Sequence, residues 1–160
     1  MGESLSAAAG HAAFSVVRLA EGNRADWDAL YAGYAEFYRT VQTAAMRDRV
    51  WSWLHDPGHE LEGLIALDGA GRGIGLAHFR PFARPLAAST GGFLDDLFVA
   101  PDWRGRGVAD ALVEAVVAEA RRRGWVMVRW ITADDNQRAR GFYDRIAEIT
   151  PWVTYQITLA

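Results

Sequence analysis

The sequence predicts an α/β fold in which a mixed sheet is flanked by helices. A strand-like run at 93–99 is followed by a turn, an Ala- and Val-rich helical segment and a second apolar run at 125–132. Two strands joined through a helix in this way lie parallel, with a right-handed crossover. Upstream, the apolar runs 61–67 and 73–79 are separated by Asp68-Gly69-Ala70-Gly71, a composition typical of a hairpin turn. These two strands are therefore expected to be antiparallel, and a sheet with both kinds of pair is mixed.

The elements are expected in the order βααβββαβαβ. The first strand is predicted at 14–19, and a helix at about 26–38 follows, with aromatic residues at three- and four-residue spacing. A second helix, 44–54, ends before Asp56-Pro57-Gly58. The remaining predictions are strands at 61–67, 73–79, 93–99, 125–132 and 152–159, helices at 108–123 and about 137–147, and an exposed loop at 80–92.

Local signals support several of these boundaries. Gly124 follows the helix 108–123, and glycine is common just after a helix because it readily adopts the left-handed conformation there. The run 125–132 is almost continuously apolar, which is typical of a strand covered on both faces. The segment 80–92 is rich in Pro, Ala, Ser and Gly, which favours a loop.

Length and composition are those of one globular domain. The 160 residues are 51% hydrophobic and 23% charged, with a net charge of -3. This balance argues against nucleic acid as the main partner, and no apolar run approaches the ~18 residues of a membrane-spanning helix. The absence of cysteine excludes a disulfide, a thiolate metal site and a cysteine nucleophile. We expect a flexible tail at 1–12, a single domain at 13–160 and a cytoplasmic location.

The turn between 93–99 and 108–123 is suited to binding a phosphate group. It reads Arg104-Gly105-Arg106-Gly107-Val108-Ala109. Its glycines let the backbone approach a ligand closely, and the helix that follows aims N–H groups and the positive end of its dipole at the turn. The dinucleotide motif GxGxxG and the triphosphate motif GxxxxGK followed by Ser or Thr are both absent. We therefore expect a nucleotide-like ligand of another kind.

This turn matches R-x-x-G-x-A, and here the chain resembles the GCN5-related N-acetyltransferase (GNAT) family. In that family the pattern follows a strand and opens a helix, as it does after the LFVAP of this chain. A second family pattern, N-x-x-A-x-x-F-Y, matches the segment from Asn136 to Tyr143. The resemblance covers roughly 61–143. It implies acetyl-coenzyme A (acetyl-CoA) as the cosubstrate, with no metal.

The resemblance also implies roles for individual residues. The backbone N–H groups of the turn would hold the pyrophosphate, and the preceding strand would pair with the pantetheine arm. Tyr143 takes the position of a general acid that protonates the departing thiolate, with packing on the sheet as the structural alternative. Asn136 is also a helix cap by composition. The residues implied in cofactor binding are Leu97, Phe98, Val99, Arg104, Gly105, Arg106, Gly107, Val108, Ala109, Asn136, Ala139 and Arg140.

Asp95 and Asp96 are adjacent carboxylates in an otherwise apolar strand. Because strand side chains alternate, we expect them to point to opposite faces, with one in or near the cleft. A carboxylate beside the acceptor can bind an ammonium group and remove its proton, directly or through water. An exposed strand end or a salt bridge is the structural alternative. The segment LDDLFV resembles L-E-D-x-F-V of the diamine and polyamine acetyltransferases, with Asp95 in place of a longer Glu.

The acceptor pocket implied by the resemblance lies on the first helices. Tyr31, Tyr34 and Glu36 are the candidate substrate-binding residues, because aromatic rings and a carboxylate suit a cationic amine. An amphipathic core helix is the alternative interpretation. The histidines, His78 among them, are expected to be structural or exposed rather than catalytic bases, and their spacing predicts no metal site.

These observations predict an acetyl-CoA-dependent N-acetyltransferase that acts on the primary amine of a small cationic acceptor. Since no cysteine can carry an acetyl group, we expect direct attack in a ternary complex. A protein N-terminus or lysine is the alternative acceptor, and a non-catalytic acyl-CoA-binding sensor is the alternative class. After Tyr143 the chain lacks the L-G-F typical of the family. We expect a homodimer, whose interface can include the last strand.

Overall fold

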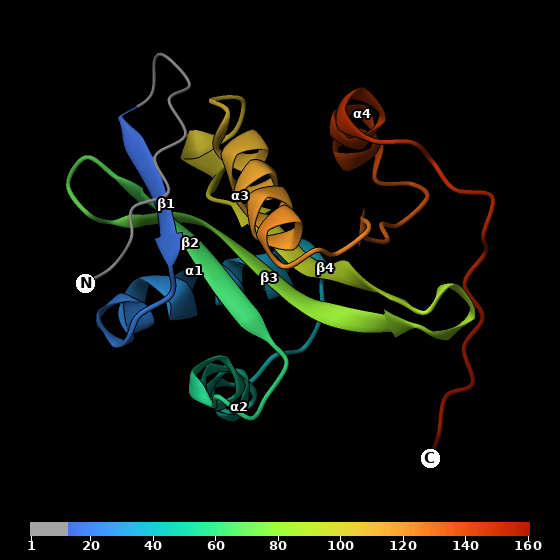
Figure 1. Cartoon of the computed structure of the whole chain (residues 1–160). Coiled ribbons are helices and arrows are strands. Elements are labelled where there is room, and N and C mark those ends of the chain that lie inside the picture. Colours follow the sequence, from blue (N-terminus) through green and yellow to red (C-terminus); the bar gives the residue numbers. More distant parts are fainter. Residues whose placement is uncertain (1–12) are drawn as a thin grey trace. The chain divides into compact units, whose positions relative to one another are not determined.

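The computed structural model describes residues 13–160, and its centre is a five-stranded mixed sheet (Figure 1). The strands β1 (Phe14–Arg18), β2 (Glu62–Asp68), β3 (Gly73–Arg84) and β4 (Ser89–Val99) pair antiparallel in that order. The short β5 (Val128–Arg129) pairs parallel with β4. The predicted α/β class with a mixed sheet is therefore confirmed, while the expectation for residues 1–12 lies outside the described residues.

The chain divides into two compact units, one ending at Trp130 and the other running from Ile131 to Ala160. The first unit holds the sheet and the helices α1 (Arg24–Phe37), α2 (Ala44–His55) and α3 (Val108–Arg122), and the second holds α4 (Gln137–Ile146). No helix in the described part of the chain is both long enough and apolar enough to cross a membrane. The single domain expected over 13–160 stays a prediction.

Helices cover both faces of the sheet in the first unit (Figure 1). On one face, Gly75 of β3 leaves room for the side chains of Val108 and Leu112 of α3. On the other face, α1 packs on β3 and β4. The core on that side consists of Trp27, Leu30, Ile65, Leu76 and Phe98. Burial of side chains of this kind contributes about 1.5–3 kcal/mol each, so α1 is held firmly beside β4.

The segment 80–92 is a paired hairpin rather than a loop, so that prediction was wrong. The strands β3 and β4 stay paired along it, up to a 3-10 turn at Pro85–Ala87. Glycine serves close packing here: a Cβ added to Gly91 would meet the Phe82 ring at 2.6 Å. The glycine that suggested a loop is therefore present because the Phe82 ring of β3 lies against the backbone of β4 at Gly91.

The last predicted strand, 152–159, does not form, so this prediction was also wrong. These residues are exposed and have no strand pairing, although their apolar and polar residues alternate. A strand needs a neighbouring edge for its backbone hydrogen bonds. The described unit from Ile131 to Ala160 contains α4 and no strand that supplies such an edge. The strand predicted at 125–132 is likewise reduced to β5.

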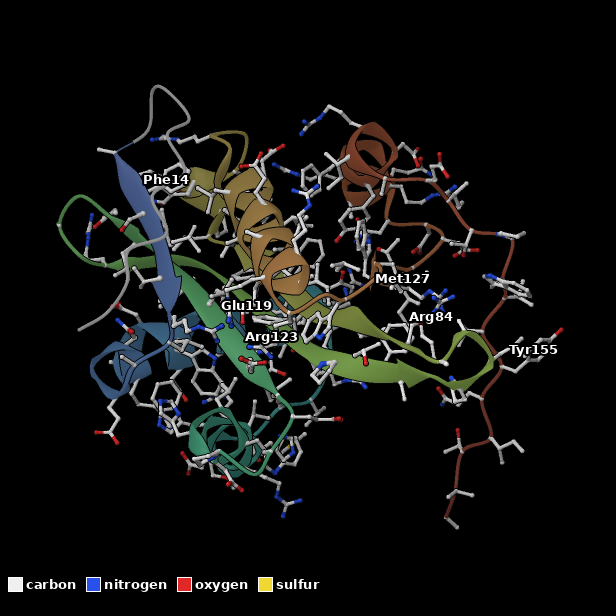
Figure 2. All side chains as sticks on the ribbon, viewed as in Figure 1. Phe14, Arg84, Glu119, Arg123, Met127 and Tyr155 are labelled. Carbon is white, nitrogen blue, oxygen red and sulfur yellow. The ribbon has the colours of Figure 1, made fainter. Side chains whose placement is uncertain are left out.

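Charged side chains form a cluster at the C-terminal end of α3. Glu119 is only 6% exposed; it accepts hydrogen bonds from Arg122 and Arg123 at 2.6 and 2.5 Å (Figure 2). Glu119 also pairs with Arg18 of β1 at 2.8 Å, and both Arg18 and Arg123 bind Glu62 of β2. The arginines, Arg122 foremost, lower the pKa of Glu119 to about 2. The cluster thus ties α3 to the first two strands.

Replacing Glu119 by Gln is expected to destabilise the fold at neutral pH and to flatten its pH dependence in acid. The folded-state pKa of Glu119 is about 2, below its ordinary 4.5. The stabilisation from the Glu119 carboxylate is therefore complete above pH 4.5 and is lost as the pH falls towards 2, a difference of roughly 3 kcal/mol. Urea unfolding at several pH values measures this. The exposed Glu114→Gln on the same helix is the matched control, and equal behaviour of the two variants would contradict the assignment.

Candidate active site

One side of β4 is partly open. β3 pairs with β4 along one side, whereas β5 reaches the other side only in the first half of the strand. In the described part of the first unit, no strand continues this pairing along 94–99. The Ala100 N–H donates to the Ile74 carbonyl of β3 at 2.8 Å. By strand alternation, the backbone groups of Val99 and Leu97 therefore point to the open side. An extended ligand arm can pair there with the Val99 N–H and with Leu97.

The chain leaves β4 directly into the turn that the sequence indicated as a phosphate site. Gly105 and Gly107 are exposed and have positive φ angles of 74° and 82°, and Gly107 is the N-cap of α3. The first helical hydrogen bond runs from the Ala111 N–H to the Gly107 carbonyl. The N–H groups of Val108 and Ala109 precede it and have no partner inside the helix. With the helix dipole behind them, these groups are suited to an anion.

The two arginines of the turn are placed differently. The Nε of Arg104 donates to the Val99 carbonyl at 3.1 Å. Its guanidinium lies 5.3 Å from the ring centroid of Phe37 and 5.6 Å from that of Phe98. Arg104 therefore fastens the end of β4 to the aromatic end of α1. Arg106 is exposed, so its charge is the one placed to meet a ligand from solvent.

Asp96 is the centre of a hydrogen-bond network on the α1 face of the sheet. Its Oδ2 atom lies 2.8 Å from His78 Nδ1 and accepts from the Tyr31 hydroxyl at 3.0 Å. His78 is fully buried, and its Nε2 accepts from the Trp27 indole N–H at 2.8 Å. The Asp96 side chain keeps 20% of its surface exposed. The network thus holds a carboxylate in a fixed place between core and solvent.

Tyr31 is a hydrogen-bond donor to this carboxylate. Burial, followed by the charge of Asp96 and the hydrogen bond to it, raises the pKa of the Tyr31 hydroxyl above its ordinary value. The hydroxyl therefore keeps its proton at neutral pH and donates a hydrogen bond to Asp96. The Tyr31 ring also meets His78 edge-on, with ring centroids 4.8 Å apart. The structure places Tyr31 beside Asp96, and its binding of substrate stays a prediction.

Asp95 occupies a β-bulge, which changes the expected relation of the two carboxylates. The register of β3 and β4 shifts at this point, so that Asp95 has no residue opposite it. A bulge interrupts strand alternation, so the expected opposite orientation of Asp95 and Asp96 no longer follows. The Nε of Arg80 lies 3.2 and 3.1 Å from the two Asp95 oxygens. Burial raises the pKa of Asp95, and the nearby charge of Arg80 opposes this rise.

The other two predicted substrate-binding residues differ in their surroundings. Tyr34 is half-buried, and its ring lies 6.1 Å from that of Tyr31 and 5.8 Å from that of Phe98, between centroids. Glu36 is exposed, and in the described chain no hydrogen bond or ion pair joins it to Tyr31 or Asp96. The structure therefore brings Tyr34 into the aromatic cluster near Asp96 and leaves Glu36 at the surface.

The second unit carries the residues of the downstream pattern on α4 and its cap. Asn136 is the N-cap, and its side-chain oxygen accepts from the Ala139 N–H at 3.3 Å. Arg140 Nη1 donates to the Asp134 carbonyl at 2.7 Å. Tyr143 lies about one helical turn beyond Ala139. The predicted helix and its cap are confirmed, while the cofactor and catalytic roles of these residues stay predictions.

Sequence reasoning did not predict the partners of the two carboxylates. It expects His78 to be structural or exposed, which agrees with its burial, but it gives Trp27 and Arg80 no part in the site. In the structure His78 joins Trp27 to Asp96, and Arg80 binds Asp95. The available signal was the pairing of two predicted neighbouring strands, since basic residues on one strand often face acidic residues on the next. The described residues contain no group of three or more His, Asp or Glu side chains placed to hold a metal ion.

Comparison with known proteins agrees with this geometry. The model of the acetyltransferase (GNAT) family matches residues 27–147. The D-amino-acid N-acetyltransferase HPA3 of Saccharomyces cerevisiae is 30% identical over 131 residues, which cover 81% of this chain and 81% of that protein. A ribosomal-protein-alanine N-acetyltransferase from Brucella melitensis biovar Abortus 2308 has a TM-score of 0.77 at 24% identity, over 92% of this chain and 99% of the other. The enzyme AAC(6')-Iy, in complex with a CoA-containing bisubstrate analog, has a TM-score of 0.76 at 20% identity, over 92% and 99%.

Proposed function

Because this chain belongs to the acetyltransferase (GNAT) family and is an acetyltransferase, we propose that it transfers acetyl from acetyl-CoA to the primary amine of a small cationic acceptor. The observation that carries this proposal is the layout of one continuous segment, 94–109. It combines the open side of β4, the glycine turn and the partly exposed carboxylate of Asp96. A strand edge, an anion site and a carboxylate are the groups that an acyl-CoA and an amine require.

The residues of the first unit fit acetyl-CoA, which supplies the activated acetyl group as a thioester. The backbone groups of Leu97 and the N–H of Val99 on the open side of β4 suit pairing with the amides of an extended arm. The N–H groups of Val108 and Ala109 suit the pyrophosphate, and Arg106 adds positive charge. Further contributions, inferred from the family pattern alone, are those of Asn136, Ala139 and Arg140.

In the proposed mechanism Asp96 binds the acceptor as an ammonium ion and removes a proton from it, directly or through water. The neutral amine then has the lone pair that attacks the thioester carbonyl carbon. A backbone N–H on the open side of β4 stabilises the oxyanion that forms. When the intermediate collapses, the C–S bond breaks, the nitrogen releases a second proton and the departing thiolate accepts one. We assign the donor of that last proton to the Tyr143 hydroxyl, which regains a proton from solvent.

Asp95 is the weaker candidate for the base. Arg80 binds both of its oxygens, so its charge is already compensated within the protein. Asp95 is also one methylene shorter than the Glu of the pattern it resembles. The role that remains for Asp95 is to accept the proton of the acceptor's ammonium group through a water molecule.

Support for a small acceptor comes from the yeast relative, whose name gives a D-amino acid as its substrate. An amino acid, a monoamine or a diamine all carry the ammonium group that Asp96 suits. A protein N-terminus or lysine side chain is the alternative acceptor, and a non-catalytic acyl-CoA sensor is the alternative class. Homodimer assembly and a cytoplasmic location stay predictions.

A panel of acceptors tests the proposal. Release of free thiol from acetyl-CoA is followed with D- and L-amino acids, diamines, polyamines, aminoglycosides and lysine peptides. We expect turnover with one or more of the small amines and little with the peptides. Turnover confined to peptides would favour the alternative acceptor. Tight acetyl-CoA binding without turnover on any acceptor would favour the sensor.

Replacing Gly107 by Ala is expected to weaken acetyl-CoA binding about tenfold, because the added Cβ is strained at positive φ and displaces the anion-binding N–H groups. Gly124→Ala is the matched control. Gly124 has a φ of 71° at the other end of α3, and neither glycine has an atom within 4 Å of an added Cβ. Calorimetric titration with acetyl-CoA measures both variants. If both lose the same affinity, the effect arises from helix strain and not from the turn.

A further inference from the structure

His78 uses both ring nitrogens in the buried network, and its partners determine which nitrogen carries the proton. The Trp27 indole N–H can only donate, so His78 Nε2 must accept and carries no hydrogen. A neutral imidazole with a bare Nε2 has its proton on Nδ1, which lies 2.8 Å from Asp96 Oδ2. His78 is therefore a neutral donor to Asp96. A second ring proton would face the indole N–H in a fully buried position.

The two oxygens of Asp96 are in different situations. Oδ2 receives hydrogen bonds from both His78 and Tyr31. Within the described residues, Oδ1 has no hydrogen-bond or ion-pair partner, and the buried polar atoms that lack a partner all lie elsewhere. Oδ1 is therefore not fully buried, and the side chain as a whole keeps 20% of its surface exposed. One oxygen is fixed from inside the protein, and the other faces outward.

The neutral state of His78 also decides the charge of the site. Two carboxylates lie side by side on β4, and Arg80 compensates that of Asp95. A neutral His78 and a protonated Tyr31 give Asp96 hydrogen bonds without cancelling its charge. Arg80 also lies 3.8 Å from Glu60, and the Arg24 guanidinium lies 5.5 Å from the Trp27 ring centroid. Among the described residues, no lysine or arginine side chain pairs with Asp96 itself, so its carboxylate can meet the ammonium group of an acceptor.

We propose that His78 is a positioning residue, locked by Trp27 as the neutral Nδ1–H tautomer, which anchors Asp96 Oδ2 and presents Oδ1 to the acceptor ammonium group. This inference rests on the proposed acetyl transfer to an amine. It goes further by naming the oxygen that binds the acceptor and the side chains that orient it. It also excludes His78 as the catalytic base, because its only bare nitrogen is occupied by Trp27.

Two conservative variants of His78 separate its two hydrogen bonds. The amide of Asn reaches the place of Nδ1 and can still donate to Asp96, whereas the amide of Gln reaches the place of Nε2 and can only accept from Trp27. We expect His78→Gln to lower kcat/KM for the acceptor about tenfold or more, since Asp96 loses an internal donor, and His78→Asn to retain most of it. KM for acetyl-CoA is expected to stay unchanged in both. His59→Gln, on the loop after α2, is the matched control.

The tautomer itself is measured by heteronuclear NMR of the histidine rings, with the His78 signals identified by their loss in His78→Asn. We expect a proton on Nδ1 and none on Nε2 at neutral pH, and a change in the ring-nitrogen signals when Trp27→Phe removes the indole donor. A His78 ring that carries a proton on both nitrogens in the unmodified protein would contradict the proposed tautomer.

The outcomes distinguish the two proposals. If the unmodified protein acetylates no amine, the proposed function fails whatever the tautomer is. If it does so, and Asp96→Asn loses activity while folded His78→Gln matches the unmodified enzyme, the function stands and the positioning role of His78 is wrong. The positioning role is also wrong if His78→Asn loses as much kcat/KM for the acceptor as His78→Gln while both variants retain their melting temperature. In that case the hydrogen bond donated to Asp96 does not account for the activity.

Discussion

Asp96→Asn is expected to lower kcat/KM for the amine acceptor by about 10²- to 10⁴-fold while leaving acetyl-CoA affinity unchanged. Asn has the same shape, and its amide oxygen can still accept from His78 and Tyr31 in place of Oδ2. The substitution removes the charge that binds the ammonium group and the basic oxygen that takes its proton. Steady-state rates with each substrate varied in turn separate the acceptor effect from the cofactor effect.

Two variants provide the comparison for Asp96→Asn. Asp48 on α2 is exposed and pairs with Arg24, so Asp48→Asn is the control for a lost surface charge. Asp95→Asn tests the neighbouring carboxylate, which Arg80 already compensates, and a smaller loss is expected there. A larger loss for Asp95→Asn than for Asp96→Asn would reverse our assignment of the two carboxylates.

Tyr143→Phe is expected to lower kcat by about 10²- to 10⁴-fold without changing the affinity for acetyl-CoA. The aromatic ring is retained, so the packing within α4 is preserved. The lost hydroxyl is the group that we assign to protonate the departing thiolate. Calorimetric titration with acetyl-CoA and the rate of thiol release measure the two quantities separately.

The C-terminal segment supplies the control for this substitution. Tyr155 is 90% exposed, and we expect Tyr155→Phe to keep full activity. If Tyr143→Phe also keeps full activity, Tyr143 is not the general acid and the proton comes from water or another group. A loss of acetyl-CoA binding in Tyr143→Phe would instead assign it to the cofactor site.

Local patterns predicted the parts of the site that depend on neighbouring residues in the chain. The strand, the glycine turn and the helix α3 lie within one short segment, and the capping of α4 by Asn136 depends on the first turn of that helix. Such features follow from turn chemistry and helix caps. Asp95 and Asp96 were singled out together for a related reason, because a carboxylate in an apolar strand is costly unless it is paired or solvated.

The environment of Asp96 could not be predicted in the same way. His78 lies on another strand and Trp27 on a helix far away in sequence, and they meet Asp96 only through the register of β3 with β4 and the packing of α1. The bulge at Asp95 is invisible to a rule of strict alternation. The last predicted strand is the opposite case, in which a local pattern was present but no strand formed. Apolar and polar residues alternate along 152–159, but the described second unit contains no strand with which this segment could pair.

The most direct test of the account is to follow an isotope-labelled acetyl group from acetyl-CoA. The labelled cofactor is mixed with the best small amine of the panel, and the product is identified by mass spectrometry and NMR. We predict that the label appears on the primary amine nitrogen of the acceptor in an amount equal to the thiol released, and that Asp96→Asn suppresses it. Thiol release with the label recovered as acetate, or attached to the protein itself, would contradict direct transfer to an amine.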